Sequence, residues 1–354
     1  MGNRWRRVFL DRAFALARAA WVAGALAFLA DAAGAHLTEQ ELHFLYELNR
    51  ARNDPPGWAV EQGLGSRTGG DGQPTTLVGV EPRPPLAMNE ILGDSSGFKA
   101  EEMAAEDYFS HQSQVGPDFF HPNELVRNVF GYPLPEQVPA PGGGVFLFTD
   151  DFNSVESIAC GFGQGTQNLT QAIHALTLLI VDANVPSLGH RTHLLATNEF
   201  NSIFTEAGAG YGVNNSANCR NYWAFHTGVT DPAGQFLTGV AFDDGDGDDL
   251  FDPGEGLAGV TVNVGGAQTT TNDAGGWSLP VADGTHAVSC LGGGFVGTGS
   301  ASVPVSGANR QVDCVSGFDG VYVDFVAVWE PPQALSGVLA VFLVAALARR
   351  ARGA

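Results

Sequence analysis

The first part of the chain carries apolar residues at helical spacing, with a start signal in front of them. Leu42, Leu45 and Leu48 recur every three residues and predict one buried helical face. Thr38 and Glu41 stand three residues apart just before this run, which is the pattern of a capping box. A pair of prolines follows and stops the helix. The pattern therefore predicts a first helix directly after residue 37.

Further elements of both kinds follow in the same part of the chain. Apolar periodicity predicts a second helix from Asn89 to Tyr108 and a third from about Asn168 to Asp182. Two stretches rich in aromatic and small residues, 202–213 and 219–229, predict strands joined by an asparagine-rich turn. Helices interleaved with a few strands predict an α/β sandwich for residues 36 to about 231.

The pattern changes at about Gln235. Helical periodicity ends, and short runs of valine and threonine alternate with glycine and aspartate turns. Such a sequence is typical of a small all-β sandwich, which we expect over residues 235–320.

Both ends of the chain read as targeting segments. Residues 1–35 have a basic start, an apolar stretch and the sequence Ala33-Gly34-Ala35, which together predict a secretory signal peptide and a mature chain from about His36. In residues 331–354, prolines precede an apolar run from Leu335 to Ala348 and then arginines. The run is shorter than the about 20 residues of a transmembrane helix.

The layout of this tail resembles bacterial sorting tails of the PEP-CTERM kind. The resemblance implies a secreted protein held at the cell surface or outer envelope, with the tail contacting the membrane and the arginines on its inner side. The tail is either a cleaved sorting signal or a retained anchor.

The net charge of the chain limits the kind of partner that it can bind. Thirty-eight acidic residues against 17 basic ones give a net charge of −21, which argues against a nucleic-acid partner. The acidity suits a protein that meets cations, or simply one that stays soluble.

The chain has four cysteines and no CxxC pair, and an even number in an exported protein predicts disulfides. Position along the chain favours the pairs 160–219 and 290–314, with other pairings open.

Histidines and carboxylates gather at the ends of predicted elements. His111 follows the second helix, Glu156 lies in a separate short segment, Asp182 ends the third helix, and His190 and His193 follow in "PSLGHRTHLL". Histidine with a carboxylate suits a divalent metal or acid–base chemistry. The alternative is that each polar residue caps or fixes a loop, and spacing alone favours it.

Ordered motifs over residues 37–229 resemble the CAP/SCP superfamily of cysteine-rich secretory and related proteins. They are "LNRAR", "PPLAMNEIL", "MAAEDYFSHQS", "ESIACG", "VPSLGHRTHLL", "AGAGYG" and "YWAF". The resemblance implies an α-β-α sandwich with a cleft lined by two histidines and two acids. Carried over by motif, this tetrad is His111, Glu156, Asp182 and His190. We further expect Arg191 to fix the turn and His193 to pack or face solvent.

The resemblance implies binding of a small ligand, which includes lipids, and of zinc or another divalent metal at His111 and His190. Two departures weaken metal affinity: Val155-Glu156-Ser157 replaces Gly-Glu-Asn, and the second acid is an aspartate. We expect the two imidazoles within the about 5 Å reach of one metal or water. The rival interpretations are a metal-dependent extracellular hydrolase that uses both histidines, although no nucleophile stands out, and a structural adhesin.

The segment "FDDGDGDDLFDPGEG" carries the oxygen-ligand spacing of an EF-hand loop without flanking helices. Asp249 occupies the position of the turn glycine, and the loop with its following sequence resembles calcium-binding B-type repeats of bacterial surface adhesins. A solvated acidic turn is the alternative, but the five ligand carboxylates, together with Asp249, repel each other within twelve residues without a cation. We therefore predict one calcium ion bound by Asp244, Asp246, Asp248, the backbone carbonyl of Leu250, Asp252 and Glu255.

Overall fold

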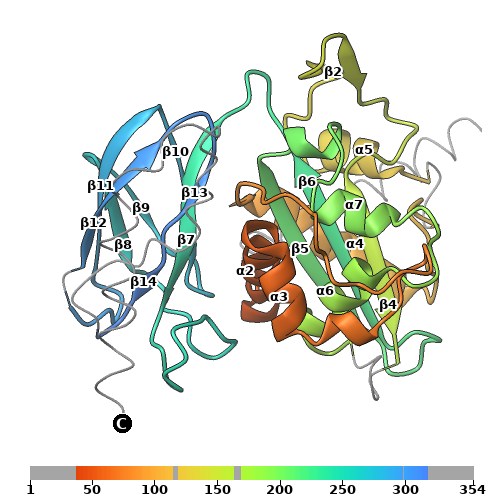
Figure 1. Ribbon diagram of the computed structural model, residues 1–354, viewed down its shortest axis with the longest axis horizontal. Helices are drawn as coiled ribbons and strands as arrows, with labels where there is room; N and C mark the ends of the chain where they lie inside the picture. The colour runs from red at the N-terminus through yellow and green to blue at the C-terminus, as the bar shows by residue number, and fades with distance from the viewer. Residues whose placement is uncertain (1–36, 115–118, 163–168, 298, 318–354) are drawn as a thin grey trace, which may run out of the picture.

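The structure is a computed structural model that describes residues 37–114, 119–162, 169–297 and 299–317. A part with helices and a sheet comes first, and an all-β module from residue 235 follows it (Figure 1). The predicted signal peptide and C-terminal tail lie outside the described residues. Within those residues, no helix is both long and apolar enough to cross a membrane.

A four-stranded sheet forms the centre of the first part. Its strand order is β1 (Ala87–Met88), β5 (Glu206–Val213), β6 (Asn221–Gly228) and β4 (Glu156–Gly161). β1 runs parallel to β5, and the other neighbours are antiparallel. β4 is therefore an edge strand, and its first residue is a candidate site residue.

One face of this sheet carries helix α4 (Glu90–Ala105) at very short range. The alternating glycines of β5 make the approach possible. A Cβ on Gly208, Gly210 or Gly212 would lie 2.1–2.3 Å from backbone atoms of α4. The glycines of "AGAGYG" thus bring the helix backbone against the sheet, because no side chain separates them.

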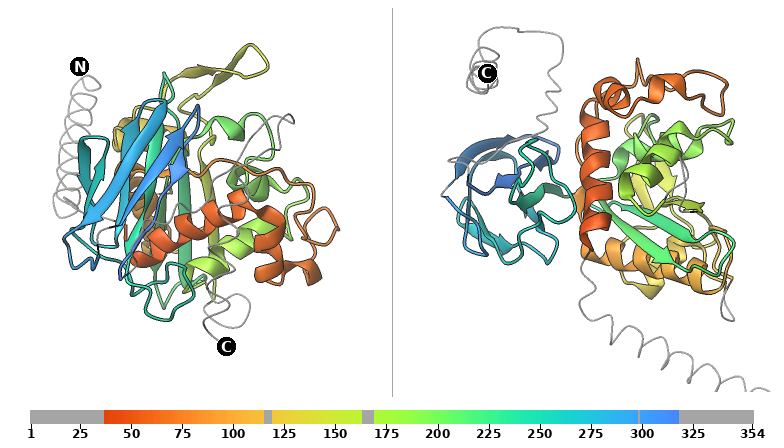
Figure 2. Two further views of the ribbon diagram at one scale, coloured as in Figure 1. Left: turned by 60° about the vertical axis from the view of Figure 1, so that its left-hand side comes forward. Right: turned by 90° about the horizontal axis from the view of Figure 1, so that it is seen from below.

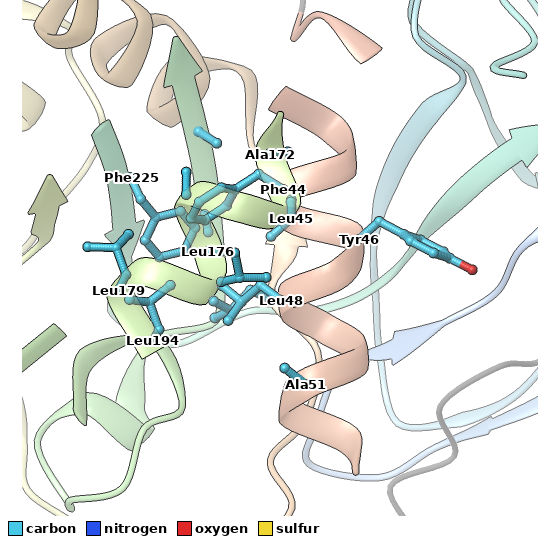
Figure 3. Close-up of a cluster of buried hydrophobic side chains, with 14 of the residues drawn as sticks. Phe44, Leu45, Tyr46, Leu48, Ala51, Ala172, Leu176, Leu179, Leu194 and Phe225 are labelled. Carbon is cyan, nitrogen blue, oxygen red and sulfur yellow. The ribbon is translucent and has the colours of Figure 1, made fainter. Parts of the chain in front are cut away.

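The opposite face carries α2 (Glu39–Asn53), α6 (Ala172–Val181) and α7 (Gly189–Leu194). Their apolar side chains form the core shown in Figure 3. Phe44 of α2 stacks on Trp223 of β6, with 5.6 Å between the ring centroids. Helices therefore lie on both faces of the sheet, and the expectation of a mixed α/β first part is confirmed.

The helix boundaries differ slightly from the sequence expectations. The capping box of Thr38 and Glu41 is present at the start of α2. α4 ends at Ala105 rather than Tyr108, and Asp107 has a left-handed φ of 52°. α6 spans fewer residues than predicted and stops when Asp182 adopts φ 54°. Left-handed residues end helices because the next turn cannot continue.

Short elements connect these layers. They are α3 (Pro55–Glu61), η1 (Leu64–Ser66), α5 (Pro122–Glu124), the π-helical turn η2 (Leu125–Val129), the hairpin strands β2 (Gln137–Pro139) and β3 (Val145–Leu147), and η4 (Asn201–Ile203). The β2–β3 hairpin projects at the top of Figure 1.

In the described residues from 235 onwards, the regular elements are all strands, as the sequence predicts. One sheet has the order β10-β7-β13, with β14 also paired to β7, and the other has the order β12-β11-β8-β9. The bounds are β7 Gln235–Phe242, β8 Thr261–Val264, β9 Ala267–Thr270, β10 Gly276–Val281, β11 Gly284–Leu291, β12 Ser300–Val305, β13 Arg310–Gln311 and β14 Cys314–Val315. Valines and Trp277 from both sheets fill the space between them.

The module is joined to the first part by more than a linker. Phe251 is fully buried and meets Tyr46 of α2 edge to face, with ring centroids 5.6 Å apart. Figure 3 shows Tyr46 leaving α2 on the side away from the other labelled core residues, and Figure 2 shows the module beside this helix. The Asn49 amide donates to the carbonyl of Leu86 at 3.0 Å and to Gln311 of the module at 3.1 Å. Apolar contacts and buried hydrogen bonds therefore cross the boundary.

The two disulfides favoured by sequence position are confirmed. Cys160 of β4 pairs with Cys219, and Cys290 pairs with Cys314 inside the module. The described residues contain no free cysteine.

Candidate functional site

His111 and Glu156 form a hydrogen-bonded pair at the edge of the central sheet. His111 Nδ1 lies 2.8 Å from Glu156 Oε1, and the imidazole is 41% exposed whereas the carboxylate is fully buried. Asn153 Nδ2 lies 3.0 Å from the same nitrogen. A hydrogen bond to a charged carboxylate is the stronger of the two contacts, so Nδ1–H donates to Glu156. In the neutral ring, Nε2 then carries the lone pair.

Asp182 and His190 form a second pair with the same geometry. His190 Nδ1 lies 2.8 Å from Asp182 Oδ1, with side-chain exposures of 25% and 3%. The other carboxylate oxygen accepts the backbone N–H of His190 at 2.9 Å. Asp182 therefore caps the start of α7 and orients its histidine. This arrangement follows from the left-handed end of α6, which turns the Asp182 side chain towards α7.

Glu156 has a second imidazole partner, which the sequence reasoning missed. His226 Nε2 lies 2.9 Å from Glu156 Oε2, and both side chains are fully buried. Ser95 Oγ of α4 lies 2.7 Å from His226 Nδ1. His226 sits one residue beyond the "YWAF" motif, and its place in a strand made it look like an ordinary core position.

The charges around Glu156 decide its ionisation. Burial raises the pKa of this carboxyl group, but hydrogen bonds from His111 and His226, with the charges of His226 and Lys99, outweigh burial and lower the pKa to about 2. Lys99 is itself buried, and its ammonium group donates to the hydroxyl of Tyr108 at 2.8 Å. A carboxylate charged at any physiological pH thus lies beneath His111.

His193 lies under the site and is held neutral. Its ring nitrogens each lie 2.8 Å from a hydroxyl, Nδ1 from Ser157 and Nε2 from Thr227. Burial, together with smaller effects of the charges of His190 and His111 among others, lowers the pKa of His193 to about 3. Both exposed histidines therefore lie close enough to influence His193. Of the two expectations for this residue, packing is confirmed.

Arg191 fixes the turn before α7, as expected. Its guanidinium donates to the carbonyl of Ile180 at 2.6 Å and to that of Val181 at 2.9 Å. These bonds tie α7 to the end of α6, so the Asp182–His190 pair stands on a rigid corner.

The acidic loop of the module brings its carboxylates together. Asp244, Asp246 and Glu255 offer oxygens within 4.8 Å of one another, and so do Asp246, Asp248 and Asp252. Asp249 takes the left-handed conformation, with φ 66°. Within the described ranges, these two are the groups of three or more candidate metal ligands. Neither group includes His111 or His190.

Comparisons with known proteins add little beyond this geometry. No protein-family model matches the chain. No curated protein matches it either. Among solved structures, an extracellular protein containing an SCP domain from Bacillus anthracis matches over 41% of this chain and 34% of its own length, with 19% identity and a TM-score of 0.25. The chain thus spans about a third of that protein.

Proposed function

We propose that this chain is a secreted CAP/SCP-like protein whose histidine–carboxylate site binds a small ligand and, weakly, a divalent metal. The all-β module braces this domain and holds one calcium ion in its acidic loop. The C-terminal tail would attach the protein to the cell envelope.

One observation carries the proposal: two partly exposed imidazoles are each oriented through Nδ1 by a buried carboxylate. Among the described residues, Nε2 of His111 and Nε2 of His190 have no hydrogen-bond partner, so both remain available to a ligand. The buried His193, by contrast, contacts a protein hydroxyl at each ring nitrogen. Two imidazoles with one nitrogen each to spare are typical of a binding site.

Apolar groups next to the site favour an amphipathic ligand. Phe109 is 50% exposed and stands two residues before His111, and Phe152 is 61% exposed beside Asn153, which contacts His111. Exposed phenylalanines beside buried charges provide both an apolar and a polar contact. A lipid or another small molecule with a polar head suits this combination.

The residues also fit a divalent metal, although with few ligands. Metal-binding histidines commonly donate their second N–H to a carboxylate, as His111 and His190 do here. Zinc sites normally use three or four protein ligands, so two imidazoles would hold zinc loosely and leave positions open. A bound zinc ion would act there as a Lewis acid. The protein's own contribution is to fix the two rings and their tautomers.

Secretion is supported by the two disulfides, because such bonds persist in oxidising compartments. The signal-peptide pattern of residues 1–35 points the same way. The calcium proposal rests on the ligand spacing and on the approach of five carboxylates in one short loop.

Native mass spectrometry of the secreted chain tests the ligand proposal. The wild-type protein should retain a small molecule that His111→Ala and His190→Ala both lose. His121→Ala is the matched control, because His121 lies in the same domain and makes no capping hydrogen bond. A wild type that retains no ligand but hydrolyses ester or peptide substrates would favour the hydrolase. A wild type that neither retains a ligand nor hydrolyses these substrates would favour the structural adhesin.

A further inference from the structure

We infer that His226, backed by Ser95, is a positioning residue that fixes the Glu156 carboxylate so that His111 presents Nε2 to the ligand. The inference rests on the proposed function, because it concerns the same site. It assigns a role to two fully buried residues that make no contact with solvent.

The backbone register places these residues side by side. Glu156 of β4 stands directly opposite His226 of β6, and His226 stands opposite Gly208 of β5. Directly paired residues of neighbouring strands have side chains on the same face of the sheet. This is the face that α4 covers. Gly208 has no side chain, so the imidazole of His226 and the backbone of α4 share the space above it.

The close approach of α4 brings Ser95 to the array. A Cβ on Gly208 would lie 2.1 Å from the backbone nitrogen of Gly93, which shows how little room separates helix and strand. Ser95 stands one half-turn further along α4, and its Oγ reaches both His226 Nδ1 at 2.7 Å and the carbonyl of Leu92 at 3.0 Å. The ring of His226 is therefore held at one nitrogen by the helix and at the other by the strand partner.

Two donors are needed to fix a glutamate carboxylate. The terminal torsion of a glutamate side chain has a broad energy minimum, so one hydrogen bond leaves the carboxylate free to rotate. His111 is the partner of Oε1 and His226 the partner of Oε2. With the plane fixed, Oε1 stays directed at His111 Nδ1. The chain of contacts from Ser95 through His226 and Glu156 to His111 thus connects a buried serine of α4 to a ring that is 41% exposed.

The second pair of the site lacks this support and provides an internal reference. Asp182 is fixed by backbone N–H groups of α7 and does not contact His226. A change in His226 should therefore alter His111 and leave His190 as it is. A general loss of structure would alter both.

Imidazole ¹⁵N NMR of the full chain at pH 7 tests the inference. In the wild type, His111 and His190 should both show the tautomer protonated at Nδ1. In His226→Leu, His111 should shift towards mixed tautomers while His190 keeps its signal. His226→Gln should restore the His111 signal, because its amide can still donate to Oε2, and Ser95→Ala should give a smaller shift in the same direction.

Titration with Zn²⁺ alone gives a second readout, with calcium present to fill the acidic loop. We expect a loss of affinity of about 10-fold or more in His226→Leu, which is the usual effect of removing a residue that orients a ligand. His193→Gln is the matched control, since it removes another buried histidine that does not contact Glu156, and it should leave the His111 tautomer unchanged.

An unchanged His111 signal in His226→Leu would overturn the inference, and so would an equal change at His190. These outcomes are separate from a failure of the proposed function. A wild type that retains no ligand contradicts the function, whereas the tautomer shift needs no ligand and tests the positioning role by itself.

Discussion

At the scale of the residue, the site depends on two buried titratable groups, of which one stays ionised and the other stays neutral. Glu156 stays ionised because its pKa is lowered to about 2, and His193 stays neutral because burial lowers its pKa to about 3. The carboxylate contributes stability that is complete above its ordinary value of 4.5 and is lost as the pH falls towards 2. His193 affects stability at a higher pH than Glu156 does, so the contributions of the two residues to the pH dependence of stability can be measured separately.

His193 should make the protein less stable between pH 7 and pH 5. The unfolded chain takes up a proton below the ordinary pKa of 6.5, whereas folded His193 does so only near 3, so acid favours unfolding throughout this window. The loss from this residue should be about 2 kcal/mol at pH 5. Urea denaturation at both pH values measures it, and His193→Gln should remove most of this pH dependence. Equal pH dependence in the two proteins would contradict the assignment.

The four residues of the tetrad could be inferred from sequence motifs, and the buried partner His226 could not. His111, Glu156, Asp182 and His190 stand at element ends within recognisable motifs, and the structure places them in two pairs. His226 stands inside a strand among aromatic residues. Its role depends on which residue lies opposite in the sheet and on how near α4 comes, and neither follows from local pattern.

At the scale of the element, the glycines of β5 set the distance between α4 and the sheet. This distance determines whether Ser95 reaches His226. The sequence stretch "AGAGYG" predicted a strand. The reason for a glycine at every second position becomes clear only in the structure, where that face of the strand contacts the backbone of α4. The helix start signals were more informative, because the capping box of α2 is formed by residues near each other in sequence.

Two alanine substitutions in this layer should have opposite effects. Gly210→Ala places a Cβ 2.1 Å from the Ser96 backbone, so α4 must move, and the free energy of unfolding should fall by about 1–3 kcal/mol. Gly97 lies within α4, and a Cβ added there would meet no atom within 4 Å, so Gly97→Ala should raise the free energy of unfolding by about 0.5–1 kcal/mol. Chemical denaturation measures both. Equal effects in the two variants would show that α4 does not rest directly on β5.

At the scale of the whole molecule, the β-module and the first part share an apolar core. Phe251 of the acidic loop is buried against Tyr46, and Asp252 in the same loop lies 3.8 Å from His43 of α2. A small all-β module was expected from the sequence, and a change of pattern at Gln235 located its start. The contacts across the boundary could not be predicted, because they join residues that are far apart in the sequence, such as Asn49 and Gln311, which are 262 positions apart.

Calcium should therefore stabilise the full chain and not only the loop. At a calcium concentration 100-fold above Kd, binding to the folded state contributes about 2.7 kcal/mol. The thermal midpoint should rise by several degrees relative to a chelator control. Asp246→Asn should lose this rise, because Asp246 belongs to both groups of three carboxylates, whereas Asp273→Asn, an exposed change elsewhere in the module, should keep it. A thermal midpoint that is the same with calcium and with chelator would mean that the loop is a solvated turn.

The central claim is that the His111–Glu156 and Asp182–His190 pairs serve one binding site. Isothermal titration of Zn²⁺ into the full chain, with the acidic loop saturated by calcium, tests this claim most directly. A shared site predicts one zinc ion per chain, with binding reduced at least tenfold by His111→Ala and equally by His190→Ala, and unaffected by His121→Ala. Two independent zinc ions, each lost with only one histidine, or zinc binding that survives both substitutions, would contradict the account.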